Sequence, residues 1–443
     1  MRGKRIIGLL VLSTSLLVMP ALEVPAAPPA SAAELETVQL EQQGPGRYVG
    51  TVPSADVVSV AAMLDGRRLE LRWQDGNRWS PWRGVAASGE HAPDPDSVEA
   101  ATARSDISEP MWIGETSALE VRADGPGPVT LELVRMTGGL GYDAAAPTVT
   151  DSAEALAIWP PIIPRYRWDP RGDCQPTSAP RTADTARRIY IHHTVIFPHY
   201  DRDEADDVVR ATCLGHVNRR GFADVGYNFL IDVYGNIYQG RAGGILQPVI
   251  GAHASGFNRG SIGIAIIGDF DAHRVPAEAV SALDRLVAWL SDLHGIEPFE
   301  VSGHVSTGGE TTRFAEGEVV ELPAIVGHRD TALNSACPGD HLYEYVRGGH
   351  PMAPRVRQIL ESAYGWSGTP LSPPPPGEPQ IVAPSAGHDH DHDEPEQSAS
   401  LGDVVRELGE VVRAPDPAQA VRGLVRGATV ASELVAPQEQ PAP

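Results

Sequence analysis

An uninterrupted apolar run, SIGIAIIG at residues 261–268, is the feature that most constrains what this chain can fold into. A strand without alternating polar residues is typical of one buried on both faces, and such a strand needs a covering layer on each side. Other strand-like runs and segments of helical spacing surround it, at 188–193, 226–233, 237–238, 203–218, 276–294 and 353–364. The mixture predicts an α/β domain over residues 161–365, in which helices flank a mixed central β-sheet.

Residues 34–136 have the pattern of β-structure instead. Two short alternating runs surround Asp75-Gly76, which is a hairpin signal, and alternation returns at 119–134. We predict a small all-β, sandwich-like accessory domain here, followed by a linker at 137–160. Its tryptophans could form a sugar-stacking surface, or they could be core and hairpin-packing aromatics, the commoner use; they are Trp73, Trp79, Trp82 and Trp112.

Both ends of the chain differ from these domains. Residues 1–33 have a basic start, an apolar run and a small-residue stretch ending at Ala33, which predicts a cleaved secretory signal peptide. An uncleaved membrane anchor is the alternative, but Pro20 and several hydroxyl side chains interrupt the run. We therefore expect a secreted, cell-wall-associated protein with no membrane span after cleavage. Residues 366–443 predict a Pro-rich acidic tail that is mostly disordered and includes the His388–Asp393 tract.

Composition excludes several classes of function. The 443-residue chain has a formal charge of −23, and a surface this acidic repels phosphate backbones, so nucleic acid is excluded as a partner. Lys4 is the only lysine and lies in the predicted signal peptide, which excludes a catalytic lysine from the mature chain. The sequence does not determine an oligomeric state, and we expect a monomer.

Histidine and cysteine together suggest a metal site. His192 and His193 end a buried-type strand, His328 follows another apolar run, and Cys337 comes nine residues later. Two imidazoles and a thiolate would leave the fourth tetrahedral position of zinc to water, as in catalytic sites. Such a zinc would lower the pKa of that water and polarise a carbonyl. The spacing matches no standard motif, and a free cysteine in a secreted protein does not by itself indicate a metal.

A series of short segments between residues 163 and 339 is more specific. They are IPRYRW at 163–168, IHHT at 191–194, DVGYNF at 224–229, GNIYQGR at 235–241, GAHASGFN at 251–258, SIGI at 261–264, GHRD at 327–330 and ACPG at 336–339. In this order they resemble the family of peptidoglycan-recognition proteins and N-acetylmuramoyl-L-alanine amidases, which includes amidase-type lysozymes of bacteriophages. The long connection at 295–322 and the preceding β-rich region resemble its secreted actinobacterial branch.

The resemblance implies a zinc (Zn2+) site. The first histidine of the His-His-Thr segment matches the family's ligand, which selects His192, and strand alternation directs His193 to the opposite face. His328 and Cys337 match the other two ligands.

Two further residues match positions near the reacting atoms. Tyr227 matches the family's active-site tyrosine, whose phenol can hydrogen-bond the developing oxyanion. Ser335 stands where the family usually has lysine or threonine and can supply a hydroxyl but no charge. The interval from His328 to Cys337 is one residue longer than the family's commonest form, which makes the placement of Ser335 less definite.

The resemblance also implies a groove for the substrate. Arg241 matches an arginine that can pair with the carboxylate of a diaminopimelate stem residue, although a structural role is the alternative. Gly221 and Phe222 stand where the family often has Gly-Trp, so Phe222 would keep a flat apolar wall. His253 and Asn258 either line the groove or serve in turns.

The remaining cysteines and histidines have expected roles as well. Cys174 and Cys213 could form a disulfide, which would leave Cys337 for the metal and account for the odd number of cysteines; two buried thiols are the alternative. We expect His216, together with His273 and His304, to be exposed.

Two functions are compatible with these residues. The resemblance implies a zinc-dependent N-acetylmuramoyl-L-alanine amidase that cuts the amide bond between N-acetylmuramic acid and L-alanine in peptidoglycan. The alternative is a non-catalytic peptidoglycan-binding recognition protein of the cell envelope. Because every matched segment lies within 161–365, we expect this domain to hold the whole catalytic apparatus.

Overall fold

The computed structural model describes most of the chain between Ala32 and Val382. The described residues are 32–51, 57–64, 66–85, 91–114, 116, 118–137, 160–195, 200–347, 352–367 and 380–382. Nearly all of the predicted signal peptide, the predicted linker and the predicted tail, with its His-Asp tract, therefore lie outside the described residues. Among the helices that the structure describes, none has both the length and the apolar composition needed to cross a bilayer.

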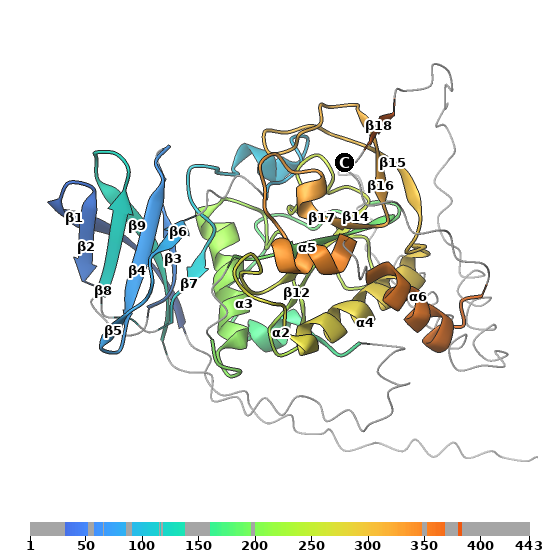
Figure 1. Ribbon diagram of the computed structural model, residues 1–443, viewed down its shortest axis with the longest axis horizontal. Coiled ribbons are helices and arrows are strands. Elements are labelled where there is room, and N and C mark those ends of the chain that lie inside the picture. Colours follow the sequence, from blue (N-terminus) through green and yellow to red (C-terminus); the bar gives the residue numbers. More distant parts are fainter. Residues whose placement is uncertain are drawn as a thin grey trace, which may run out of the picture.

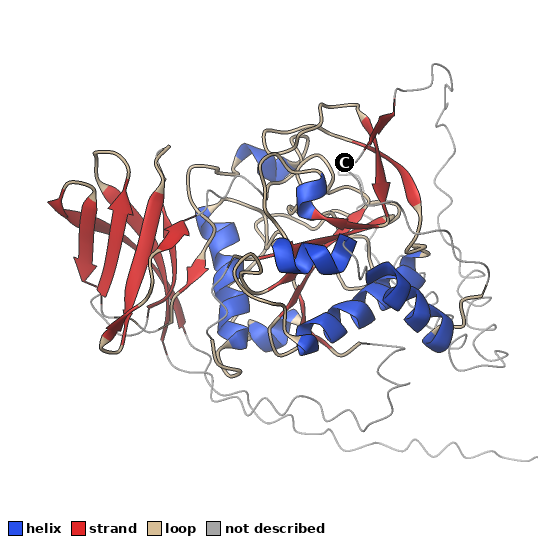
Figure 2. Ribbon diagram, viewed as in Figure 1, coloured by secondary structure: helices blue, strands red, loops and turns tan. Residues whose placement is uncertain are grey.

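The N-terminal domain consists of strands around one apolar core (Figures 1 and 2). Its first strand, β1, pairs antiparallel with β9 from Ala32 to Leu40 and with β2 from Glu41 to Gly44, so this strand joins the two parts of the sheet. The nine strands form one continuous sheet, and Leu71, Leu131 and Leu133 lie in the core of this all-β domain. The strands are β1 Ala32–Gly44, β2 Arg47–Thr51, β3 Val57–Ala62, β4 Leu69–Asp75, β5 Arg78–Trp79, β6 Arg83–Val85, β7 Met111–Trp112, β8 Ala118–Ala123 and β9 Val129–Thr137.

The predicted hairpin at Asp75-Gly76 is present between β4 and β5, and Gly76 has a φ of 55°, in the left-handed region that glycine adopts without strain. Packing accounts for two of the four tryptophans. Trp73 and Trp112 are buried, whereas Trp79 is 38% exposed and lies beneath the Arg72 guanidinium.

The second domain is built on a six-stranded mixed sheet in the order β10-β13-β12-β14-β11-β17. The apolar run that opened the sequence forms β14, which pairs in parallel with β11 on one side and β12 on the other. The strands are β10 Ile162–Ile163, β11 Arg188–His193, β12 Phe229–Ile231, β13 Ile237–Gln239, β14 Ser261–Ile266 and β17 Ile325–Gly327. All six residues of β14 are buried, which confirms the expectation for this strand.

Helices cover both faces of this sheet (Figure 1). On one face, α4 and α6 pack on Ile189, Ile191 and Ile264. On the other face, α3 packs on Leu230 and Ala265. The helices are α2 Arg165–Trp168, α3 Ala205–Leu214, α4 Ala277–His294, α5 Asp340–Arg347 and α6 Met352–Ala363, with helical turns η3 Gly215–Arg219 and η4 His328–Asp330. The expected α/β architecture with flanking helices is therefore confirmed.

The long connection after α4 forms a small sheet of its own. Strands β15 Val301–Val305 and β16 Val319–Pro323 pair antiparallel, and β18 Gln380–Val382 adds to β16. Strand β18 lies within the tail that was predicted to be mostly disordered, and it uses the edge of β16, where a strand offers unpaired backbone groups to a short extended segment.

The two domains contact each other directly. Trp112 and Val134 of the first domain belong to the same apolar cluster as α3 of the second. Between β6 and β7 the chain also leaves the sandwich and crosses the second domain, where its short helix η2 Val98–Ala101 lies, visible in cyan in Figure 1. We refer to residues 91–109 of this connection as the covering segment.

The position of Ile264 at the centre of the sheet gives a test of the fold. Truncation by Ile264→Ala removes a fully buried side chain and should lower the free energy of unfolding by about 2–5 kcal/mol. The matched change Val301→Ala, at a side chain that is 42% exposed, should stay within about 0.5 kcal/mol. Denaturant unfolding of both variants measures this, and equal losses would contradict the assigned core.

Candidate metal centre

Four side chains that are distant in sequence converge at one edge of the central sheet. They are His91, His192, His328 and Cys337, all buried, and their ligand atoms lie within 4.8 Å of one another. The Cys337 Sγ lies 3.7 Å from His91 Nε2 and 3.7 Å from His192 Nδ1. The structure therefore brings together the three residues predicted as zinc ligands and adds His91, which lies outside residues 161–365.

Strand geometry explains why two of these histidines meet. β11 and β17 are parallel neighbours, His192 lies near the end of β11, and His328 directly follows β17. Side chains at the carboxyl ends of adjacent parallel strands share one edge of the sheet. Along β11, Ile191 packs in the core beneath α4, His192 faces the cluster, and His193 accepts a hydrogen bond at Nδ1 from the Phe270 amide instead.

The residues fit a zinc ion on three observations. Donors at Zn–S about 2.3 Å and Zn–N about 2.0–2.1 Å stand roughly 3.6 Å apart at a tetrahedral angle, close to the two distances from Cys337 Sγ. Burial, together with the neighbouring histidines, lowers the pKa of both His192 and His328 well below the usual range, which favours the neutral imidazole that metals bind. The buried Nδ1 atom of His328 has no hydrogen-bond partner among the residues that the structure describes.

A second histidine orients His192. The Nδ1 atom of His253 lies 3.1 Å from His192 Nε2, the ring atom turned away from Cys337. Burial lowers the pKa of His253 to about 3, so this ring is neutral too. A Cβ at Gly263 of β14 would come within 2.4 Å of the His253 ring, so glycine is required for this approach. His253 was predicted to line the groove or serve in a turn. Its amide donates to Asn258 Oδ1 at 2.7 Å, which is the turn role, and its ring also supports the metal cluster.

Glu109 determines which nitrogen of His91 faces the cluster. Burial alone would raise the pKa of Glu109, but the Arg220 guanidinium and hydrogen bonds from His216 and His91 outweigh it and hold the pKa well below its usual range. An ionised carboxylate only accepts hydrogen bonds, so His91 Nδ1, 3.2 Å from Glu109 Oε1, carries the proton. The unprotonated Nε2 of His91 then faces the cluster, 3.7 Å from Cys337 Sγ.

The three histidines that were expected to be exposed are buried or partly buried, so that expectation was wrong. His216 is fully buried, and His273 and His304 are partly buried. The Nδ1 atom of His216 accepts the Gly226 amide at 3.0 Å, and its Nε2 lies 3.2 Å from Glu109. A ring next to a buried carboxylate is buried because it satisfies that carboxylate, and no local sequence pattern reveals such a partner.

Tyr227 and Ser335 both lie beside the cluster. The Tyr227 ring is buried, and its hydroxyl lies 3.5 Å from His91 Nδ1. The Ser335 hydroxyl oxygen accepts the Cys337 amide at 3.0 Å, so this side chain holds the turn that carries the thiol.

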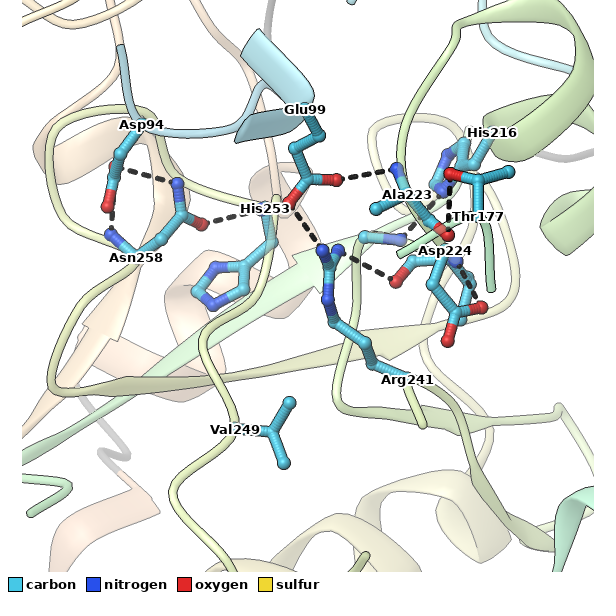
Figure 3. A network of polar contacts seen from close by, with 12 residues as sticks. Asp94, Glu99, Thr177, His216, Ala223, Asp224, Arg241, Val249, His253 and Asn258 are labelled. Atoms are coloured by element: carbon cyan, nitrogen blue, oxygen red, sulfur yellow. Dashed lines mark hydrogen bonds and ion pairs between the residues drawn. The ribbon is translucent and has the colours of Figure 1, made fainter. Parts of the chain in front are cut away.

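Two residues predicted for substrate binding are tied to the covering segment (Figure 3). The Arg241 guanidinium forms a buried ion pair with Glu99, whose second carboxylate oxygen accepts the Ala223 amide at 2.7 Å. Asn258 donates from Nδ2 to Asp94 Oδ1 at 2.8 Å.

The other two predicted residues lie in the same area. Gly221 accepts a hydrogen bond from the Thr102 hydroxyl at 2.7 Å. Phe222 is buried, and it lines a cavity of about 670 Å³ together with His91 and other residues of the covering segment. The four predicted substrate-binding residues therefore lie under the covering segment; they are Gly221, Phe222, Arg241 and Asn258.

The structure contains the disulfide expected between Cys174 and Cys213, while Cys337 stays outside any disulfide. His91 was the residue that sequence reasoning missed. Its only local signal is a histidine beside acidic and proline residues in HAPDPD, at 91–96, which is too common a composition to indicate a ligand.

The fold and the cluster together define a class: an α/β domain with a buried histidine and cysteine site of the kind that holds zinc. Comparisons with known proteins identify the family of the second domain. The family model described as N-acetylmuramoyl-L-alanine amidase matches residues 182–340. A peptidoglycan-recognition protein of Drosophila simulans is 35% identical over 188 residues, which cover 42% of this chain and 85% of that protein. Peptidoglycan-recognition protein SC2 of Drosophila melanogaster is 28% identical, over 42% of this chain and 84% of that protein.

Among solved structures, Drosophila PGRP-LB is 26% identical, with 43% of this chain and 94% of that chain covered and a TM-score of 0.34. On the strength of the sequence relatives, the chain belongs to the family of peptidoglycan-recognition proteins and N-acetylmuramoyl-L-alanine amidases.

The orientation of the two adjacent histidines gives a test of the site. His192→Ala should abolish stoichiometric zinc binding, because the ring faces the cluster, whereas His193→Ala should leave zinc content near that of the wild type. Metal analysis of the purified folded variants measures this. Equal zinc loss from both variants would mean that the ligand assignment is wrong.

Proposed function

We propose that the protein is a secreted zinc-dependent amidase that hydrolyses the bond between N-acetylmuramic acid and L-alanine in peptidoglycan. The observation that carries the proposal is the convergence of His192, His328 and Cys337 beside Tyr227 in a chain of this family. Zinc held there would polarise the scissile carbonyl and activate water.

The chain's own residues supply orientation and charge stabilisation. His253 keeps the His192 ring in place, and the Ser335 hydroxyl holds the turn before the thiolate. The Tyr227 hydroxyl can donate a hydrogen bond to the oxyanion that develops on the carbonyl oxygen. Arg241 offers a buried guanidinium for a stem-peptide carboxylate, which favours a diaminopimelate-type substrate.

A non-catalytic recognition protein is the second candidate. One observation favours it: His91 is the fourth member of the cluster, and four protein ligands are typical of closed, structural zinc sites. The two functions differ in whether the purified chain changes the polymer or only binds it.

Removal of the thiolate separates the candidates. Cys337→Ala should lose both zinc and hydrolysis, because it deletes the sulfur ligand of the site. Mass spectrometry of muropeptides should show release of stem peptides with free L-alanine amino termini by the wild type, and no release by the variant or with a chelator. A variant with full activity and stoichiometric zinc would reject the mechanism.

The tyrosine gives an independent test of the chemistry. Tyr227→Phe should retain zinc but slow turnover by about 100-fold or more, the usual cost of losing one oxyanion donor. Rates on a soluble muropeptide, normalised to zinc content, measure this. The control variant is Tyr234→Phe. The Tyr234 hydroxyl donates to the Tyr200 carbonyl, shortly before α3, and its loss should leave the rate at the wild-type value. An unchanged rate for Tyr227→Phe would remove the phenol from the mechanism.

A further inference from the structure

The covering segment leaves its own domain to lie across the metal centre of the other. Residues 92–104 of this segment bond the second domain, whereas residues 106–108 stay hydrogen-bonded to the end of β3 in the first domain. The Arg104 amide donates to the Arg220 carbonyl at 2.8 Å, and the Ala92 carbonyl accepts from Asn258 Nδ2 at 3.0 Å. These contacts hold residues 92–104 over the surface formed by Gly221, Phe222, Arg241 and Asn258.

Two acidic side chains of the segment are buried by these contacts. Asp94 accepts hydrogen bonds from the Gly256 amide at 2.8 Å and from Asn258 Nδ2 at 2.8 Å. Glu99 pairs with Arg241 and is 8% exposed (Figure 3). Burying a carboxylate is costly unless charged or hydrogen-bonding partners meet it, and here the second domain provides those partners.

His91 is directed at the metal cluster by a dedicated support. Glu109 accepts its Nδ1 proton, and Arg220 and His216 hold Glu109 in turn. A carboxylate behind a histidine is the arrangement that fixes the tautomer and orientation of metal-binding imidazoles.

From these contacts we propose that the covering segment is a built-in inhibitor of the second domain: His91 Nε2 is a fourth ligand that closes the metal site, and Glu99 occupies Arg241 in place of a ligand carboxylate. The proposal rests on the proposed function, because it concerns the same site. In this state there is no position at the metal for water, and the guanidinium is not accessible to a stem peptide. Activity then requires the segment to move away.

Cobalt spectroscopy tests the closure of the metal site without measuring hydrolysis. With Co2+ in place of zinc, the visible spectrum of the full chain should not change when azide is added, because all four positions are filled by protein. The spectrum of His91→Ala should shift, because azide can bind at the vacated position. His294→Ala, at the end of α4 on the far face of the sheet, serves as the matched control. An azide shift in the wild type equal to that of His91→Ala would overturn the proposal.

Binding of a soluble diaminopimelate-type muropeptide tests the role of Glu99. In the uncovered state the segment has moved away and Arg241 is free of Glu99. If this state makes up about 1–10% of the wild type, the Glu99→Ala variant should bind the muropeptide about 10- to 100-fold more tightly than the wild type does. Glu70→Ala removes an exposed carboxylate from strand β4 of the first domain, and this variant should bind as the wild type does. Unchanged or weaker binding by Glu99→Ala would reject the competition for Arg241.

One measurement needs no substitution. Addition of saturating muropeptide to the wild-type chain should speed hydrogen exchange at the covering-segment amides, such as that of Arg104, because the ligand displaces the segment. Unchanged or slower exchange there would overturn the displacement.

The outcomes separate this proposal from the amidase assignment. A His91→Ala chain that binds azide and cleaves muropeptide faster than the wild type supports both. A His91→Ala chain that binds azide but releases no stem peptide rejects the amidase and leaves the closure in place. A cleaving chain whose wild-type spectrum already shifts with azide rejects the closure alone.

Discussion

The buried carboxylate of Glu109 is the interaction on which the arrangement of the two domains depends. It comes from the N-terminal domain, whereas two of its partners, Arg220 and His216, come from the second. Removing one partner of such a buried ion pair typically costs about 3–5 kcal/mol, because the other charge is left uncompensated. These contacts join the covering segment to the second domain, and the same carboxylate holds His91 at the candidate metal centre.

The second domain supplies a rigid frame for this contact. The apolar strand β14 is buried between two helical layers, and β11 and β17 deliver His192 and His328 to one edge of the sheet. Ligands held on the ends of packed strands keep their positions when a loop above them moves. The sheet can therefore hold the site in place when the covering segment moves away, and the second domain does not have to refold.

Arg241 shows how the two proposals combine. A buried guanidinium is costly without an anionic partner, so it must be paired either by the protein or by a ligand. In the described state Glu99 is that partner. A stem peptide with a carboxylate would therefore exchange one ion pair for another, which keeps the energetic difference between covered and uncovered states small enough for binding to decide it.

Local sequence patterns determined much of this protein. The continuous apolar run specified a doubly covered strand, the Asp75-Gly76 turn specified a hairpin, and period-2 alternation along β11 put His192 and His193 on opposite faces. Only the tertiary structure decided that His91 joins Cys337, 246 positions away, and that Glu99 pairs with Arg241, 142 positions away. Both contacts join the two domains. Residues that pair across domains leave no periodicity or spacing signal in the sequence. These contacts are selected by the burial of charged and imidazole side chains against one another.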